Sequence, residues 1–380
     1  MGSLIMGILC GVMGVLGYLS QQNFVTLIEA VFGKKQSKIF YLLRGLDCAG
    51  WYGINIAAAT QLIINLVTLI TGTKVNTIFY LIIFITLLII NAIIAQSATK
   101  LDKLLTLTLL IMAIGIFFVL LNMGSTGINA ASALTNSHSL NFRDIIGNIC
   151  VVAAYWNGFA LNMFDFGRNA KDRKTAFWGN CSGIVIGMLA MAVIAAVFSV
   201  QAYLTTGNYN WNLSRSLLYL STNLPAHLLV VTVFLMFMIA TNAVANYYPA
   251  IQCIKAIRHN NHIKVNASIF LVISSAITPF FISSTTSEIA YYWINLCGTV
   301  LAPLLAILIC YLILKNSGLI TVYQYRWIYL IWTSLYIGVE LFTLTILSYL
   351  WLVSIIGIFV TVYFIYQINK NKLSLDKLAS

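Results

Sequence analysis

Tryptophan and asparagine residues occur at helical spacing inside apolar stretches of this sequence. One stretch reads RGLDCAGWYGIN, and its Trp51 and Asn55 are four residues apart, so they share a face if the stretch is helical. Another reads YWNGFALNMFDFGRNAK and places Trp156 directly before Asn157 and Gly158. An indole face can hold a planar ring, with stacking worth about 1–3 kcal/mol per base in single-strand binding proteins, and an amide offers donors and an acceptor to the ring edge. These residues predict a site for a flat, uncharged solute rich in hydrogen-bonding groups, a description that nucleobases fit.

A third stretch, FMIATNAVANYYP, adds Thr241, Asn242 and Asn246 to the candidate residues. An amide that faced lipid would be costly, so we expect these side chains to point into the interior of a helix bundle. Two other interpretations stay open. A tryptophan in a membrane helix often anchors the helix at the interface or packs against a neighbour, and an interior asparagine often bridges two helices.

The acidic residues near these stretches have more than one interpretation. Asp47 lies on the helical face of Trp51, where it could be protonated during transport, but we favour an ion pair with Arg44. Asp165 and Arg168 are three residues apart and predict a local ion pair.

The composition is that of a polytopic membrane protein. Of 380 residues, 61% are hydrophobic and 8% are charged, with a mean hydropathy of +0.93, whereas soluble domains carry about 25% charged residues. A helix needs about 20 apolar residues to cross a hydrocarbon core of about 30 Å. Runs of this length predict eleven membrane helices, at residues 2–20, 38–70, 76–96, 103–122, 146–166, 175–204, 226–252, 264–283, 287–315, 327–347 and 349–369.

The basic residues indicate how these helices are oriented. The net charge is +12, but the basic residues form no single patch, which argues against nucleic acid as a partner. Most of them fall in every second loop, starting with the loop after 2–20 and ending with the segment after 349–369. By the positive-inside rule these segments are cytoplasmic. We therefore expect a multi-pass protein of the cytoplasmic (inner) membrane with a cytoplasmic C-terminus.

The sequence shows no motif of a reaction centre, so we do not expect an enzyme. The seven cysteines are scattered without a CxxC pair and are typical of apolar packing residues. The four histidines lie at or near predicted loops, and GxSxG, HExxH and P-loop motifs are absent. We expect neither a metal site nor a cofactor, and the sequence leaves the oligomeric state open.

The charge pattern places the first residues outside the cell, which predicts a further helix ahead of Met1, through a misassigned start codon or a truncation. Twelve helices with both termini in the cytoplasm are common among secondary transporters, many of which are inverted repeats with helices broken near the bilayer midplane. Residues 1–122 would form an incomplete first repeat, 146–315 the second repeat, and 327–369 two additional helices. Gly158 would let the helix at 146–166 unwind or approach a neighbour closely, and Gly179, Gly183 and Gly187 predict close helix contacts.

The chain resembles the nucleobase:cation symporter family 1, and within it is most similar to bacterial cytosine permeases. The resemblance is carried by the stretches GYLSQQNFVTLIEAVFG, GWYGIN, WNGFALNMFDFGRNAK and ATNAVAN, and more loosely by the segment around Pro303. It implies an all-α polytopic membrane protein with the leucine-transporter-like inverted repeat, alternating access, and a family first helix that is missing here.

The resemblance also implies roles for individual residues. Trp51 and Trp156 would sandwich the ring of the substrate, Asn55, Asn242 and Asn246 would contact its edge, and Thr241 would contribute a hydroxyl to the cation site. Two departures matter. Many sodium-dependent members have adjacent hydroxyl residues where this chain has Ala240-Thr241, and the acidic-aromatic pair of the family's tenth helix is Cys310-Tyr311 here. Because hard cations need several oxygen ligands, the lost hydroxyl makes coupling to sodium doubtful, and coupling to protons stays open.

We therefore expect a secondary active transporter that imports cytosine or a related nucleobase by symport with a proton or sodium ion. One alternative is a transporter of the same fold for another small solute, such as hydroxymethylpyrimidine, hydantoin, allantoin or an amine. Another is a truncated remnant that does not transport.

Overall fold

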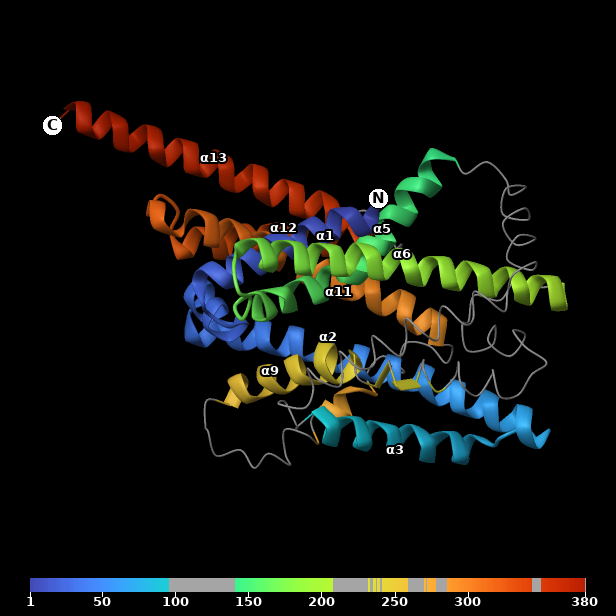
Figure 1. Ribbon diagram of the computed structural model, residues 1–380. Helices are drawn as coiled ribbons and strands as arrows, with labels where there is room; N and C mark the ends of the chain where they lie inside the picture. The colour runs from blue at the N-terminus through green and yellow to red at the C-terminus, as the bar shows by residue number, and fades with distance from the viewer. Residues whose placement is uncertain are drawn as a thin grey trace.

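The protein is described by a computed structural model, and every regular element in the part of the chain that it describes is helical (Figure 1). The described residues are 1–95, 141–207, 232, 235–236, 238–239, 241–258, 270, 272–277, 286–343 and 350–379. The helices are α1 (Gly2–Ser20), α2 (Phe24–Thr71), α3 (Thr77–Ala95), α5 (Phe142–Gly167), α6 (Arg173–Thr206), α9 (Tyr248–Arg258), α11 (Thr286–Leu314), α12 (Val322–Thr343) and α13 (Leu350–Ala379), with a π-helix η2 (Ala243–Tyr247) and a 3-10 helix η4 (Lys315–Ser317).

Most of the predicted membrane helices have a counterpart among these elements. By length and composition, seven of the described helices could cross a membrane: α1, α2, α3, α5, α6, α11 and α13. The predicted helix at 103–122 lies outside the described residues, as do parts of those at 226–252 and 264–283. The division into two repeats stays a prediction.

The second helix begins earlier than the sequence predicts. We expected a loop up to residue 38, but α2 begins at Phe24, and a kink at Gly33 (φ 74°) separates a short first part from the long second part. The first part buries residues at helical spacing, namely Phe24, Leu27, Ile28, Val31 and Phe32. At the kink the hydroxyl of Ser37 donates to the carbonyl oxygens of Ile28 (3.2 Å) and Gly33 (2.6 Å). The prediction was wrong because it followed total hydropathy, whereas this segment is amphipathic.

Several basic segments of the described residues lie at one end of the bundle. The Gln21 side chain donates to the carbonyl oxygen of Arg168 (3.1 Å), and the Arg326 guanidinium lies beside Gly33, next to Lys34 and Lys35. In Figure 1 the turn between α5 and α6 and the C-terminal ends of α9 and α13 point to this end, at the left, while α2 and α6 end at the right. The turn between α5 and α6 and the end of α13 therefore lie at the same end of the bundle, as the charge pattern requires.

Helix α1 packs against α5 and α6 through glycine. A Cβ atom on Gly17 would lie 2.1 Å from the carbonyl oxygen of Phe164, and one on Gly167 would lie 2.0 Å from that of Gly14. Such contacts are possible only where side chains are absent, as in small-residue interfaces of membrane helices. By contrast, Gly179, Gly183 and Gly187 of α6 have nothing within 4 Å of a built Cβ, so the prediction of close contacts there was wrong.

These glycines supply a matched pair of substitutions. We expect Gly17→Ala to force α1 away from α5 and to cost about 1–3 kcal/mol, as overpacking does. Gly183→Ala should be neutral or slightly stabilising, because alanine is the better helix former by about 1 kcal/mol. Melting temperatures of the purified proteins in detergent measure both effects, and an equal response of the two variants would contradict the close packing of α1.

Helix α2 contacts α3, α5, α9, α11 and α12, and it meets η2 as well. It is therefore the element that brings the candidate residues of the separate sequence stretches together.

Candidate functional site

The two predicted tryptophans belong to a group of aromatic side chains that connects α2 with α5. The ring of Tyr155 lies edge-on to Trp51, with centroids 5.0 Å apart, and edge-on to Trp156, with centroids 5.1 Å apart. Phe159 extends the cluster, 5.1 Å from Trp156. Such T-shaped contacts fix the orientation of the rings. We call these four residues the aromatic cluster.

The three predicted asparagines form one hydrogen-bonded group between α2 and the segment at η2. The side-chain NH2 groups of Asn55 and Asn246 donate to Oδ1 of Asn242, at 3.3 Å and 2.7 Å. The Asn242 NH2 donates in turn to the carbonyl oxygen of Tyr52, at 3.1 Å. Asn242 is buried, and Asn55 and Asn246 are half-buried. We call these residues the amide network. Since Asn55 lies one turn beyond Trp51 on α2, the network adjoins the aromatic cluster.

The backbone is irregular where two of these asparagines lie. Residues Ala243–Tyr247 are a π-helix, and the Tyr248 N–H donates to the carbonyl oxygen of Ala243. Pro249 follows, and because proline has no N–H it cannot bond the carbonyl oxygen of Ala245 four residues earlier. That oxygen accepts instead from the side-chain NH2 of Asn162 on α5, at 2.8 Å. Single π turns of this kind occur often at functional sites.

An ion pair between a buried arginine and a half-buried aspartate ties α2 to α5 below this region. Arg44, whose side chain is 2% exposed, lies 3.4 Å from Asp165 and also donates to Oδ1 of Asn162. Oδ1 of Asp165 accepts from the backbone N–H of Phe24 at 2.8 Å, and the Phe24 ring lies 3.7 Å under the Arg44 guanidinium. Both predicted ion pairs were wrong. Arg44 pairs with Asp165 rather than Asp47, and Asp165 pairs across helices rather than with Arg168, because the second part of α2 packs beside the end of α5.

Asn157 and Gly158 lie where α5 meets α2 and α11. A Cβ on Gly158 would come within 2.4 Å of Oδ2 of Asp47, so this glycine makes room for the Asp47 carboxyl group. Asn157 is fully buried and packs toward Gly298, yet its amide N and O have no hydrogen-bond partner, nor does the buried Nε1 of Trp156. The helix α5 is continuous from Phe142 to Gly167, so the predicted unwinding at Gly158 does not occur. The alternative prediction, a close approach of a neighbouring helix at Gly158, is confirmed.

Thr241 lies directly before the amide network and is half-buried, and its hydroxyl donates to the carbonyl oxygen of Met238 at 3.4 Å. All the predicted binding residues thus fall in one region where α2, α5 and η2 meet. Tyr155 was not among the predicted residues, although its position beside Trp156 was an available signal. Within the described parts of the chain, no group of three or more His, Cys, Asp or Glu residues could hold a metal ion, and the seven cysteines are buried and form no disulfide bond.

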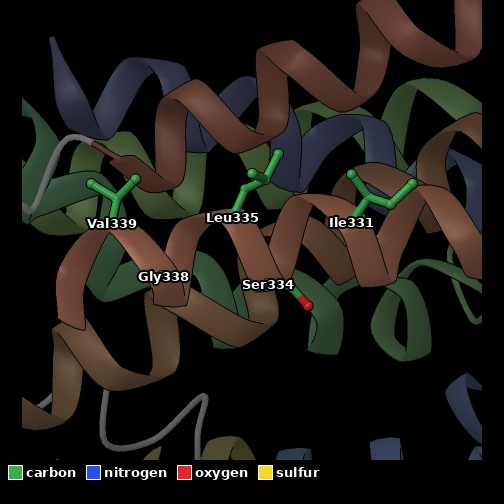
Figure 2. Close-up of a pocket in the computed structure, with 5 residues that line it drawn as sticks. All are labelled: Ile331, Ser334, Leu335, Gly338 and Val339. Carbon is green, nitrogen blue, oxygen red and sulfur yellow. The ribbon is translucent and has the colours of Figure 1, made fainter. Parts of the chain in front are cut away.

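A separate depression lies along α12 and is lined by Ile331, Ser334, Leu335, Gly338 and Val339 (Figure 2). Its aliphatic members are spaced four residues apart and share one face of the helix, and each is at least 40% exposed. With one hydroxyl and no charge, this surface has the chemistry of a lipid-facing helix and not that of a polar binding site.

Known proteins with related sequences or folds place this arrangement in context. A family model described as a permease for cytosine/purines, uracil, thiamine and allantoin matches residues 1–360. Among solved structures, the chain is similar to Mhp1, a nucleobase-cation-symport-1 family transporter, in a closed conformation with bromovinylhydantoin bound, with a TM-score of 0.72 and 15% identity over 98% of this chain and 84% of that chain. The inward-facing conformation of Mhp1 matches with a TM-score of 0.67 and 16% identity over 97% and 84%. No curated protein matches the sequence.

The comparisons confirm the predicted family and fold. The structural likeness shows that the chain has the leucine-transporter-like fold of Mhp1. The family model extends over almost the whole chain. The protein therefore belongs to the permease family for cytosine/purines, uracil, thiamine and allantoin, the nucleobase:cation symporter family that its motifs resemble.

Proposed function

We propose that this membrane transporter imports cytosine or a related nucleobase across the cytoplasmic membrane, by cation symport and alternating access. The observation that carries the proposal is the aromatic cluster directly beside the amide network. Stacking surfaces and amide groups within one helical turn of each other match the two faces and the edge of a nucleobase.

The substrate ring would enter between Trp51 and Trp156, and the amide network would supply its hydrogen bonds. Each NH2 group of the network has two N–H bonds, so donors remain beyond the contacts between Asn55, Asn242 and Asn246. Trp156 Nε1 and the Asn157 amide are buried without a partner and are further candidates for polar contact. Buried polar groups are almost always paired, so partnerless ones at a predicted binding site support a ligand there.

The coupling ion would be a proton or a sodium ion. Thr241 is the hydroxyl residue that we assign to a cation site next to the amide network, and Ala240 before it offers no side-chain oxygen. A cytoplasmic C-terminus is part of the proposal, supported by the basic residues of the turn between α5 and α6 and of the end of α13, two segments at the same end of the bundle (Figure 1).

Uptake of radiolabelled cytosine by cells that express the protein tests the proposal. We expect saturable uptake above that of cells with an empty vector, competed by an excess of unlabelled cytosine. Competition by uracil, a purine, allantoin, hydantoin or hydroxymethylpyrimidine instead of cytosine would reassign the substrate within the same site. Uptake that none of these solutes competes would contradict the nucleobase assignment, and the absence of any transport by a well-folded protein would favour a remnant.

A further inference from the structure

The Asp47 carboxyl group is buried in the middle of the helix bundle and lacks a full set of partners. The residue is 3% exposed, its Oδ1 has no hydrogen-bond partner, and its Oδ2 lies against Gly158 of α5. On the α11 side, Trp293 Nε1 donates to the backbone oxygen of Asp47 at 3.4 Å, which leaves the carboxyl group itself unbonded by that indole. A buried carboxylate is costly unless it is paired and hydrogen-bonded.

The charged and titratable groups around Asp47 do not supply that pairing. Arg44, one turn earlier on α2, is the cation whose charge reaches Asp47, but its hydrogen bonds go to Asn162 and Asp165 on α5. The other titratable neighbours are the thiols of Cys48 on α2, Cys253 on α9 and Cys297 on α11. The Cys297 thiol hydrogen-bonds to the Asp47 carboxyl group, but a thiol is a weak donor and supplies no positive charge. Asp165 already neutralises Arg44, so the local charge balance leaves the Asp47 carboxylate uncompensated.

The same carboxyl group adjoins the predicted substrate site. The Trp51 indole, one turn further along α2, lies within hydrogen-bonding reach of it. Gly158, on which the carboxyl group packs, is two residues from Trp156 and next to Asn157 with its partnerless amide. A change of charge at Asp47 therefore acts on both tryptophans that would hold the substrate.

The surroundings suit a proton better than a metal ion. A hard cation such as Na⁺ requires several oxygen ligands, whereas the groups around this carboxyl group are thiols, an indole and the backbone of Gly158. A proton needs one carboxylate oxygen, and the neutral acid that forms is a hydrogen-bond donor that can be buried at much lower cost.

We propose that Asp47 is the proton-binding group that couples substrate import to the proton gradient, a role that rests on the proposed transport function. One proton binds a carboxylate oxygen when the site faces outward, with only that O–H bond formed. The neutral group permits α2, α5 and α11 to close around the substrate. When the site opens inward, water reaches the carboxyl group and the proton leaves with the substrate.

Purified protein in liposomes tests this assignment. With an inward proton gradient and no sodium, we expect the wild type to accumulate substrate at least fivefold above equilibrium and to acidify a pH-sensitive dye inside the liposomes when substrate is added. We expect Asp47→Asn to lower the accumulation ratio to one and to abolish the acidification. Exchange of substrate at equal pH on both sides should fall about tenfold from pH 5.5 to pH 8 in the wild type, because the proton is lost, and should not vary with pH in Asp47→Asn.

A matched control is Glu340→Gln, which neutralises a carboxyl group on α12 that accepts a hydrogen bond from Thr299 at 3.2 Å. Its accumulation ratio and acidification should equal those of the wild type, and the melting temperature shows whether each variant is folded. Two results would overturn the assignment but not the proposed transport function. One is acidification of the liposomes by Asp47→Asn, and the other is wild-type accumulation that follows a sodium gradient without proton movement. The second measurement needs no variant. Absence of any heterocycle transport by the wild type would overturn the proposed function and this inference with it.

Discussion

Replacement of Trp156 by alanine should lower the affinity for the transported nucleobase by about 5-fold to 150-fold. The stacking of a base on an aromatic side chain is worth about 1–3 kcal/mol, and each 1.4 kcal/mol corresponds to about tenfold in the dissociation constant. Trp156 is held by edge contacts with Tyr155 and Phe159, so its removal deletes one face of the aromatic cluster. Binding of labelled substrate to purified protein measures the loss directly.

Two further variants separate substrate contact from packing. Trp156→Phe keeps an aromatic face and should retain part of the affinity, although it loses the Nε1 donor. Trp178→Ala removes an indole that is 63% exposed on α6 and should leave binding unchanged. If Trp156→Ala binds substrate as the wild type does and remains folded, Trp156 is a packing residue and the stacking site lies elsewhere.

Replacement of Asp165 by asparagine should destabilise the protein by about 3–5 kcal/mol. This is the typical cost of removing one partner of a buried ion pair, since the remaining charge is left uncompensated. Arg44 is the charge that would remain, and its side chain is 2% exposed. Asparagine keeps the oxygen that accepts from the Phe24 N–H, so the substitution isolates the charge. Thermal or chemical unfolding in detergent measures the change.

The control for this prediction is Arg168→Gln. The sequence alone pairs Arg168 with Asp165, whereas the structure pairs Asp165 with Arg44, so Arg168→Gln should change stability by less than about 0.5 kcal/mol. The double variant Arg44→Met with Asp165→Asn should lose less than the sum of the two single losses, because each single variant leaves a lone charge and the double variant leaves none. Equal losses in Arg168→Gln and Asp165→Asn would support the local ion pair instead.

The candidate site shows which features local sequence can predict. Trp51 and Asn55 share a helical face because their spacing matches one turn, and the same holds for Asn242 and Asn246. Their partners were not predictable in this way. The Asn55–Asn242 hydrogen bond joins residues 187 positions apart, and the Tyr155 ring reaches Trp51 from another helix. Each of these contacts depends on how two helices are rotated and shifted relative to each other.

The glycines also show that local spacing does not determine which residues meet a neighbouring helix. Gly179, Gly183 and Gly187 have the spacing of a close helix interface but face open space, while Gly17 and Gly158 lie where a neighbour leaves no room for a side chain. Spacing shows only that a face of small residues exists. Whether another helix covers that face depends on the packing of the whole bundle.

By itself the sequence determined the class of protein, the approximate limits of most helices and the family. These follow from hydropathy, charge and short motifs, which each residue expresses together with its near neighbours. Only the tertiary structure decided that Arg44 pairs with Asp165, that Asn162 bonds the carbonyl oxygen freed by Pro249, and that the Asp47 carboxyl group is buried against Gly158. These contacts join residues far apart in the chain, and their formation depends on the register and rotation of helices that pack together through many weak contacts at once.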